Sequence, residues 1–258
     1  MLQEWALITK NLFLPVFCRS CGDRLQTDEN GFFCRACWSN ILRIERPYCS
    51  VCGKPHPPMA GYHTDFNFPC AQCRETSKQS YRRMFAPAVY DGPTAAAIRL
   101  LKFRRKKKLA EPLGELMVDF ALRELDRDGY DYIIPVPLHR VRERERGFNQ
   151  SRLLAEVLLP TFHGAALDVS LKRVRPTTPQ TRLSSAEERR ANVQGAFCVE
   201  DGALAGKTVL LVDDVITTGG TASECARALR GAGVKAVDVF AVALVDNKLT
   251  GDKPVQHK

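Results

Sequence analysis

Apolar and polar residues occur along the chain in blocks that predict strands followed by helices. Four continuous apolar runs have the length of buried strands and occupy residues 85–90, 132–137, 209–212 and 236–244. Segments with apolar positions at helical spacing follow or separate them, at residues 93–103, 109–120, 153–158 and 222–229. Continuous runs are typical of strands covered on both faces, and alternation of strands with helices favours parallel pairing. We therefore predict an α/β fold with a parallel sheet flanked by helices.

The third apolar run leads into a segment with the residue types of a ligand site. Asp213 and Asp214 follow the run directly, and the strand is expected to end at Asp213, at the carboxyl edge where α/β folds bind ligands. The next turn, 217–221, contains hydroxyls and two glycines, whose backbone can adopt positive φ and bring amides close to an anion. Thr221 and Glu224 have capping-box spacing, so a helix is expected to start there with its positive end toward the turn.

This combination predicts a site for a sugar phosphate, because carboxylates accept hydrogen bonds from vicinal hydroxyls while loop amides hold the phosphate. Two other interpretations are a plain strand, turn and helix whose acids cap the helix, and a receiver domain. Receiver domains have their acid pair near the start of the domain, whereas this pair lies near the end of the chain.

Residues 209–221 resemble the phosphoribosyl diphosphate (PRPP) binding motif of type I phosphoribosyltransferases. The resemblance implies that the ligand is PRPP or another ribose 5-phosphate, bound with magnesium. It further implies that Asp213 and Asp214 contact the ribose 2′ and 3′ hydroxyls. The 5′-phosphate would lie against the residues of the turn, Thr217, Thr218, Gly219, Gly220 and Thr221.

Eight of the ten cysteines form four CxxC pairs, Cys18/Cys21, Cys34/Cys37, Cys49/Cys52 and Cys70/Cys73. The first two pairs are 12 residues apart and the last two 17, spacings that let four thiolates meet around one tetrahedral zinc ion. We predict a small double zinc ribbon with two structural zinc ions. Disulfides would require a secreted protein, and redox chemistry a thioredoxin-like context. His56 and His63 are expected to be loop residues, and Cys225 a small buried apolar residue.

Composition limits the class of partner without choosing it. A length of 258 residues allows one large domain or two modest ones, and 45% hydrophobic residues suffice for a core. The net charge of +9 favours anionic partners, which include phosphorylated metabolites and nucleic acids alike.

The first 17 residues are moderately apolar and are expected to form a short amphipathic helix. Glu4 and Lys10 interrupt the segment and no small-residue cleavage site follows, so we expect no signal peptide, no membrane span and a cytoplasmic location. After this helix at 1–17 we expect the double zinc ribbon, a linker, a phosphoribosyltransferase-like domain and a polar tail, with the bounds 18–73, 74–84, 85–246 and 247–258.

Two basic segments lie on either side of the second predicted strand. The first, the basic run, has six cations in seven residues: Lys102, Arg104, Arg105, Lys106, Lys107 and Lys108. This run suits the phosphates of single-stranded DNA, and a solvated basic face is the alternative interpretation. The second segment, 138–151, has guanidinium groups that suit a diphosphate, and its candidates are Arg140, Arg144 and Arg146. A surface of Glu–Arg ion pairs is the alternative there.

Several motifs together resemble the ComF family, which joins a cysteine zinc module to a phosphoribosyltransferase-like domain. They lie at residues 133–140, 146–151, 178–180, 188–192 and 195–197. The resemblance covers nearly the whole chain and implies a role in DNA uptake and use, with the DNA-uptake machinery as a partner.

Two functions stay open at this point. One is transfer of a phosphoribosyl group from PRPP to an unknown acceptor, in which loss of diphosphate leaves an oxocarbenium-like ribose. The other is a non-enzymatic adaptor, in which the ribbon and the basic run hold nucleic acid and the second domain only binds a ligand.

Overall fold

The computed structural model describes residues 15–25, 31–57, 66–75, 79–175, 193–200 and 203–246, together with Leu249. Most of the predicted N-terminal helix and of the polar tail lies outside these residues, as do the motifs at 178–180 and 188–192. Within the described ranges, no helix is both long enough and apolar enough to cross a membrane.

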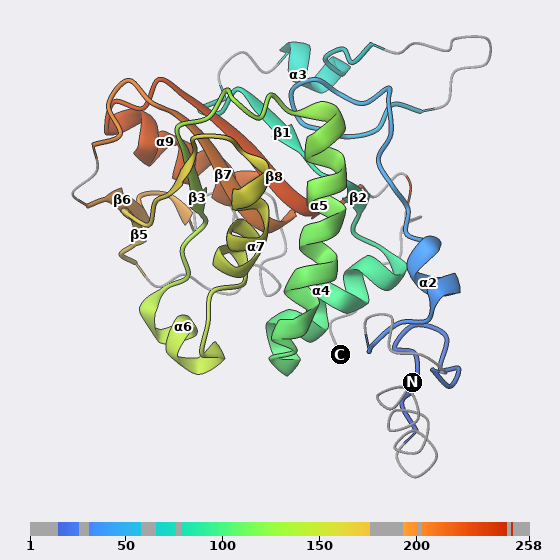
Figure 1. Ribbon diagram of the computed structural model, residues 1–258. Coiled ribbons are helices and arrows are strands. Elements are labelled where there is room, and N and C mark those ends of the chain that lie inside the picture. The colour runs from blue at the N-terminus through green and yellow to red at the C-terminus, as the bar shows by residue number, and fades with distance from the viewer. Residues whose placement is uncertain are drawn as a thin grey trace.

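A parallel β-sheet lies at the centre of the molecule (Figure 1), with the strand order β1-β8-β7-β3-β4. These strands are β1 (Arg83–Phe85), β3 (Tyr132–Pro135), β4 (Ala166–Leu167), β7 (Thr208–Ile216) and β8 (Ala236–Leu244). A further short strand, β2 (Ala88–Val89), also pairs with β8. The sheet confirms the predicted α/β class with parallel strands.

The central strand β7 is longer than the sequence predicts. Its pairing with β8 continues through Asp213, opposite Ala241, to Ile216, opposite Leu244. The prediction that the strand ends at Asp213 is therefore wrong. Because β8 continues as a regular strand to Leu244, its backbone keeps offering hydrogen-bond partners to β7 although two β7 side chains are charged.

The strand predicted at 85–90 is divided into β1, which begins at Arg83, and β2. The two parts pair with β8 through Phe85 and Ala88, on either side of Pro87. Pro87 has no N–H to donate, so regular pairing is interrupted there.

Helices cover both faces of the sheet. In Figure 1, α5 (Ala110–Glu124) and α7 (Gln150–Leu158) lie in front of the sheet, and α9 (Gly220–Gly231) lies behind it. The helix α4 (Gly92–Arg104) leads into α5 through the 3-10 turn η1 (Lys107–Leu109), and η2 (Leu159–Thr161) follows α7. The described residues of this part also contain α6 (Arg140–Arg146) and β5 (Leu171–Arg173), which pairs antiparallel with β6 (Phe197–Val199).

The cysteine-rich part packs against the edge of the sheet, and its described residues include the short helices α2 (Arg35–Ser39) and α3 (Ala71–Glu75). Its backbone pairs with the β1–β2 edge: the N–H of Ile44 donates to Pro87 O, that of Val89 to Leu42 O and that of Met84 to Val51 O, each at 2.8 Å. An uncovered strand edge is a site of unwanted pairing, and this contact removes it.

Side chains strengthen the same contact. Ile41, Ile44 and Tyr48 belong to one buried apolar cluster with the sheet residues Met84 and Phe85. The hydroxyl of Tyr48 also donates to Glu124 of α5 at 2.5 Å, and Arg46 Nε lies 3.0 Å from the same carboxylate. The cysteine-rich part and the sheet therefore share a core.

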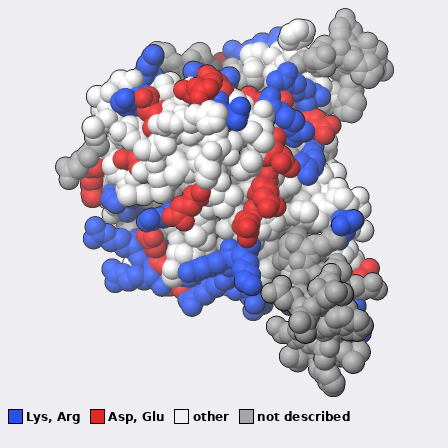
Figure 2. Space-filling view, viewed as in Figure 1, with Lys and Arg blue, Asp and Glu red and all other residues white. Residues whose placement is uncertain are grey.

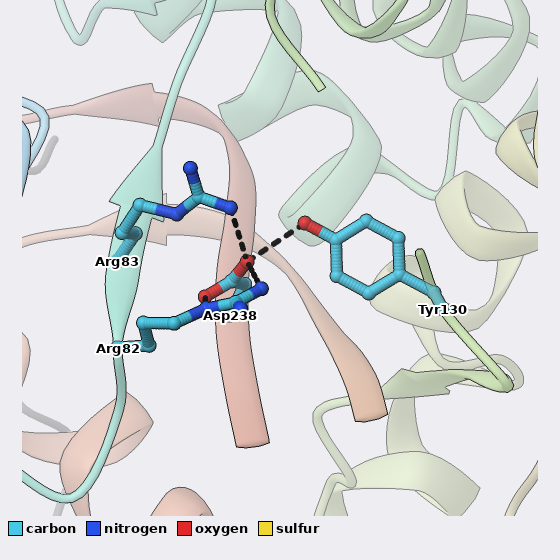
Figure 3. A network of polar contacts seen from close by, with 4 residues as sticks. All are labelled: Arg82, Arg83, Tyr130 and Asp238. Carbon is cyan, nitrogen blue, oxygen red and sulfur yellow. Dashed lines mark hydrogen bonds and ion pairs between the residues drawn. The ribbon is translucent and has the colours of Figure 1, made fainter. Parts of the chain in front are cut away.

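A buried ion network lies toward the amino-terminal end of the strands (Figure 3). Asp238 of β8 is fully buried and accepts hydrogen bonds from Arg82 (2.9 and 2.7 Å), Arg83 (3.2 Å) and Tyr130 (2.8 Å). Burial alone would raise the pKa of Asp238, but these hydrogen bonds and the two positive charges outweigh it and lower the pKa. Both carboxylate oxygens have partners, which indicates a structural role.

Replacement of Asp238 by Asn should destabilise the protein at neutral pH by about 2 kcal/mol, because a hydrogen bond to a charged group contributes about 1.5–3 kcal/mol. Since the folded-state pKa lies below the unfolded value of about 3.9, this contribution is present at neutral pH and is lost as the pH falls through the folded-state pKa. Urea unfolding of both proteins at a series of pH values measures the difference, which should narrow in acid. A difference independent of pH would contradict this account.

Candidate functional site

Asp213 and Asp214, the acid pair, lie near the carboxyl end of β7. Asp213 is half-buried, and its Oδ1 accepts hydrogen bonds from the Ser151 hydroxyl (3.0 Å) and from the N–H of Asp214 (2.8 Å). Asp214 is buried, and its Oδ1 lies 2.7 Å from Nζ of Lys102 on α4. Its Oδ2 is buried as well and has no hydrogen-bond partner within the described part of the chain. The acid pair is thus more enclosed than a pair at an open strand end.

The two neighbouring carboxylates influence each other's charge. Burial and the negative charge of Asp214 raise the pKa of Asp213 to about 7, although the charge of Lys102 and the hydrogen bond from Ser151 oppose the rise. Asp213 therefore holds its proton more strongly than an exposed carboxyl group does. The charge that the acid pair presents to a ligand depends on the cations around it.

The turn after β7 enters α9 directly. Gly219, with a φ of 75°, is the N-cap, and Gly220 is the first helical residue. The predicted capping box is wrong, because the helix begins before Thr221 and Glu224 instead accepts a hydrogen bond from the N–H of Gly195 (3.1 Å). A glycine at the N-cap allows the left-handed conformation that turns the chain from strand into helix. The positive end of α9 therefore follows the acid pair closely.

The predicted residues of the turn differ in exposure. Thr217 and Thr218 are exposed, Gly219 and Gly220 are buried, and Thr221 is half-buried. Thr217 and Thr218 therefore lie at the surface, while the two glycines lie beneath it.

Met84 connects this turn to the cysteine-rich part. A Cβ on Gly219 would lie 3.0 Å from Met84 Cε, so the two residues are in close contact. The carbonyl oxygen of Met84 would likewise lie 2.7 Å from a Cβ on Gly53, and its N–H donates to Val51 O. Val51 and Gly53 flank Cys52, so the third CxxC pair lies behind the turn.

The arginines of α6 fall on two faces of the helix. Arg140 and Arg144 are exposed, whereas Arg142 and Arg146 are half-buried, since residues four apart share one face. Burial lowers the pKa of Arg146; the charge of Asp214 opposes this effect and that of Arg142 adds to it. Arg146 therefore lies near the acid pair, while the other two predicted candidates lie on the outer face.

Four residues near the acid pair were not predicted as part of its site: Lys102, Arg142, Ser151 and Arg173. Burial lowers the pKa of Arg173 on β5, and the charges of Arg142 and Asp213 also act on it. Helical spacing from Arg146 could have identified Arg142. No local signal identifies Lys102 or Arg173, because their contacts join separate elements of the fold.

The five cations that follow Lys102 in the basic run are exposed. Two of them contact the α6 segment: Arg105 donates to the carbonyl oxygen of Glu145, and Lys107 Nζ lies 5.1 Å from the ring centroid of Phe148. In Figure 2, Lys and Arg side chains gather on the lower part of this face, where Figure 1 has α6 and the junction of α4 with α5. The basic run and α6 thus form one basic surface.

The eight paired cysteines form two groups of four. Within each group all Sγ atoms lie within 4.8 Å of one another, and the groups are Cys18, Cys21, Cys34 and Cys37, then Cys49, Cys52, Cys70 and Cys73. Backbone N–H groups support the sulfurs: that of Cys34 donates to Cys18 Sγ (3.4 Å) and that of Cys70 to Cys49 Sγ (3.2 Å). Four sulfurs at such distances, with N–H donors around them, fit a tetrahedral structural zinc site.

Each cysteine group contains a thiol that ionises readily. A hydrogen bond from Cys52 lowers the pKa of Cys49 to about 4, despite burial. Burial alone would raise the pKa of Cys18, but backbone hydrogen bonds lower it to about 6.

His56 lies outside both groups, because its ring stacks on Phe68 at 3.9 Å and Nε2 contacts the Phe68 carbonyl oxygen at 2.9 Å. Cys225 is fully buried in α9, as predicted. His63 lies outside the described residues.

The two parts of the chain match two family models. The model described as "Double zinc ribbon domain" matches residues 9–74, and that described as "Phosphoribosyl transferase domain" matches residues 151–258. Fold, cysteine groups and matches together define a double zinc ribbon protein with a phosphoribosyltransferase-like domain.

Relatives similar over nearly their whole length identify the family. DNA utilization protein YhgH of Escherichia coli (strain K12) is 33% identical over 232 residues, which cover 89% of this chain and 97% of that protein. Competence protein F of Haemophilus influenzae is 32% identical over 237 residues, or 90% and 98% of the two chains. The chain belongs to the ComF family, as its motifs predict. Among solved structures, the glutamine PRPP amidotransferase of B. subtilis aligns with a TM-score of 0.39 and 18% identity, covering 56% of this chain and 30% of that one.

The purified protein should contain two zinc ions per chain, because eight thiolates saturate two tetrahedral sites. The single variants Cys18→Ser and Cys49→Ser should each lack one of the two zinc ions. Elemental mass spectrometry on the folded protein measures the zinc content. Cys198→Ser is the control, since Cys198 lies outside both groups and should leave both ions bound. A parent protein with one zinc or none would show that the cysteine groups have another role.

Proposed function

We propose that the protein binds PRPP, or another ribose 5-phosphate ligand, at the acid pair and the turn 217–221. Magnesium accompanies the ligand. The observation that carries the proposal is the acid pair itself, in which Oδ2 of Asp214 is buried without a hydrogen-bond partner in the described residues. The pair lies near the end of the central strand, close to the N-terminus of α9. A sugar phosphate supplies hydroxyl donors for the carboxylates and an anion for the helix end.

In the proposed complex, Asp213 and Asp214 accept hydrogen bonds from the ribose 2′ and 3′ hydroxyls. The 5′-phosphate lies against the amides and hydroxyls of the turn, which are those of Thr217, Thr218, Gly219, Gly220 and Thr221. The close packing of Gly219 on Met84 supports a fixed turn, because the glycine has little room to move toward β1. A fixed turn binds phosphate without paying the entropy of ordering its own backbone.

The diphosphate of PRPP suits the cations beside the acid pair. Arg142 and Arg146 share the inner face of α6, and guanidinium groups bind phosphate oxygens in pairs. Arg140 and Arg144 lie on the outer face, where they add positive charge to the entrance. Magnesium would accompany the diphosphate of PRPP and neutralise part of its charge.

The same arrangement suits transfer of the phosphoribosyl group. Buried carboxylates beside the ribose favour the positive charge that the sugar gains when diphosphate departs, and the arginines favour the departing anion. Release of diphosphate in the presence of an acceptor would mark an enzyme; binding of PRPP without release would mark the adaptor. We place this function in the cytoplasm, where thiols stay reduced and available for zinc.

A second part of the proposal is that the basic surface binds single-stranded DNA. The relatives described as a DNA utilization protein and a competence protein motivate this assignment. The cations available are Arg104, Arg105, Lys106, Lys107 and Lys108 of the basic run, with Arg140 and Arg144 of α6. Lys102 is not part of this surface, because its ammonium group pairs with Asp214.

Replacing both Asp213 and Asp214 by Asn should weaken PRPP binding at least about tenfold. Asn keeps the size of the side chain but removes the charge that strengthens each hydrogen bond, a contribution of about 1.5–3 kcal/mol, and about 1.4 kcal/mol corresponds to one decade in affinity. Isothermal titration with PRPP and magnesium gives the dissociation constants.

The matched control for this double variant is Asp131→Asn. Asp131 pairs with Lys207 beside the start of β3, at the opposite end of the sheet, and its replacement should leave PRPP affinity unchanged. Equal affinity of the double variant and the parent would refute the assignment of the acid pair to ribose.

Changing Arg104, Lys106 and Lys108 to Ala should weaken binding of an oligothymidine and flatten its dependence on salt. If each cation contacts a phosphate, the slope of log K against log salt should fall by about 2, since each contact to a single strand contributes about 0.7. Arg105 and Lys107 are kept because they contact α6. Fluorescence anisotropy at several salt concentrations measures the slope, and an unchanged slope would return the run to a solvated basic face.

A further inference from the structure

The ion pair with Asp214 separates Lys102 from the rest of the basic run. The Lys102 side chain is 22% exposed and the Asp214 side chain 4%, with Nζ and Oδ1 2.7 Å apart. The next residues of the chain, Phe103 and Arg104, are exposed. The last turn of α4 therefore directs one cation inward and presents the next ones to solvent.

The ammonium group of Lys102 contacts one of the two adjacent carboxylates. It contacts Asp214 through Oδ1 only, whereas Asp213 is bonded by Ser151 and by the backbone. Oδ2 of Asp214 keeps its buried position without a protein partner among the described residues. Leaving a buried carboxylate oxygen unbonded costs free energy, which a ligand hydroxyl would recover.

We propose that Lys102 is a positioning residue for the ribose-binding acid pair: its ammonium group compensates negative charge in the pair and holds the Asp214 carboxylate in one orientation, so that Oδ2 accepts a hydrogen bond from a hydroxyl of the ligand. The inference rests on the proposed binding of a ribose 5-phosphate at this site. Lys102 acts through Asp214 and does not itself contact the ligand.

Other charged and titratable groups lie around the acid pair, and their effects must be distinguished from that of Lys102. They come from the segment after β2 and from α4, α6, β5 and α9, and they are Tyr90, Arg99, Arg142, Arg146, Arg173, Glu224 and Cys225. None of these residues is substituted when Lys102 alone is changed, so a comparison of Lys102 variants isolates the effect of its charge.

Removal of the Lys102 charge should change how the affinity for the ligand depends on pH. Burial and the charge of Asp214 raise the pKa of Asp213 to about 7, and the charge of Lys102 limits this rise. Without that charge, protonation of Asp213 extends to higher pH, and a protonated carboxyl group is a weaker acceptor for ribose hydroxyls. Binding should therefore be weaker at neutral pH and should recover as the pH increases.

The test is titration calorimetry of PRPP with magnesium, from about pH 6 to about pH 9, on the parent and on Lys102→Met and Lys102→Arg. The charge of Lys102 lowers the pKa of Asp213, and a nearby opposite charge typically changes a carboxyl pKa by about 1–3. Lys102→Met should therefore bind about tenfold more weakly at neutral pH, with its affinity profile shifted to higher pH by about one unit. Lys102→Arg should restore most of the affinity, because it retains the charge. Ionisation of PRPP itself affects all variants equally, so it cancels in the ratio of the variant and parent dissociation constants at each pH.

The control is Lys235→Met, which removes an exposed lysine at the start of β8 and should follow the parent profile. The positioning role is wrong if Lys102→Met binds PRPP with the affinity of the parent at every pH. It is also wrong if the affinity of the variant is lower by the same factor at every pH. If the parent binds neither PRPP nor ribose 5-phosphate, the proposed function is wrong instead. Should Lys102→Met lose the circular dichroism of the parent, Lys102→Gln, which also removes the charge, provides the same comparison with the same outcomes.

Discussion

The enclosure of two adjacent carboxylates on the central strand, one buried and one half-buried, is the constraint on which the arrangement around them depends. Such a pair is stable only if neighbouring groups compensate its charge, because an uncompensated buried charge is costly. The compensation comes from Lys102 on α4 and Ser151 on α7, with Arg146 of α6 nearby. Three helices that are distant in sequence are therefore brought to one end of the sheet.

Asp214 and Asp238 show how the same residue type serves two purposes in one fold. Both are buried on neighbouring central strands, but Asp238 has hydrogen-bond partners on both oxygens, whereas one oxygen of Asp214 has none among the described residues. A carboxylate with hydrogen-bond partners on both oxygens stabilises the fold and has little remaining capacity to accept a hydrogen bond from a ligand. The incompletely bonded carboxylate of Asp214 is the one suited to binding.

The cysteine-rich part is joined to the sheet rather than tethered beside it. Its backbone covers the β1–β2 edge, and its side chains continue the apolar core. Through Met84 it also reaches Gly219, the N-cap of the helix that follows the acid pair. Met84 therefore lies between the segment around Cys52 and the turn 217–221, although these lie in parts of the chain that the sequence suggests are separate domains.

The sequence by itself determined the features that local spacing controls. The CxxC intervals predicted two groups of four cysteines, and the apolar runs with the helical patterns between them predicted the parallel α/β sheet. The end of β7, the start of α9 and the two faces of α6 were decided by tertiary structure. The pairing of β8 extends β7 past Asp213, and the contact of α4 with the end of β7 distinguishes Lys102 from the other five cations of the basic run. Periodicity reports which residues of one element share a face, but it does not report which element that face will meet, and the chemistry of the acid pair depends on that meeting.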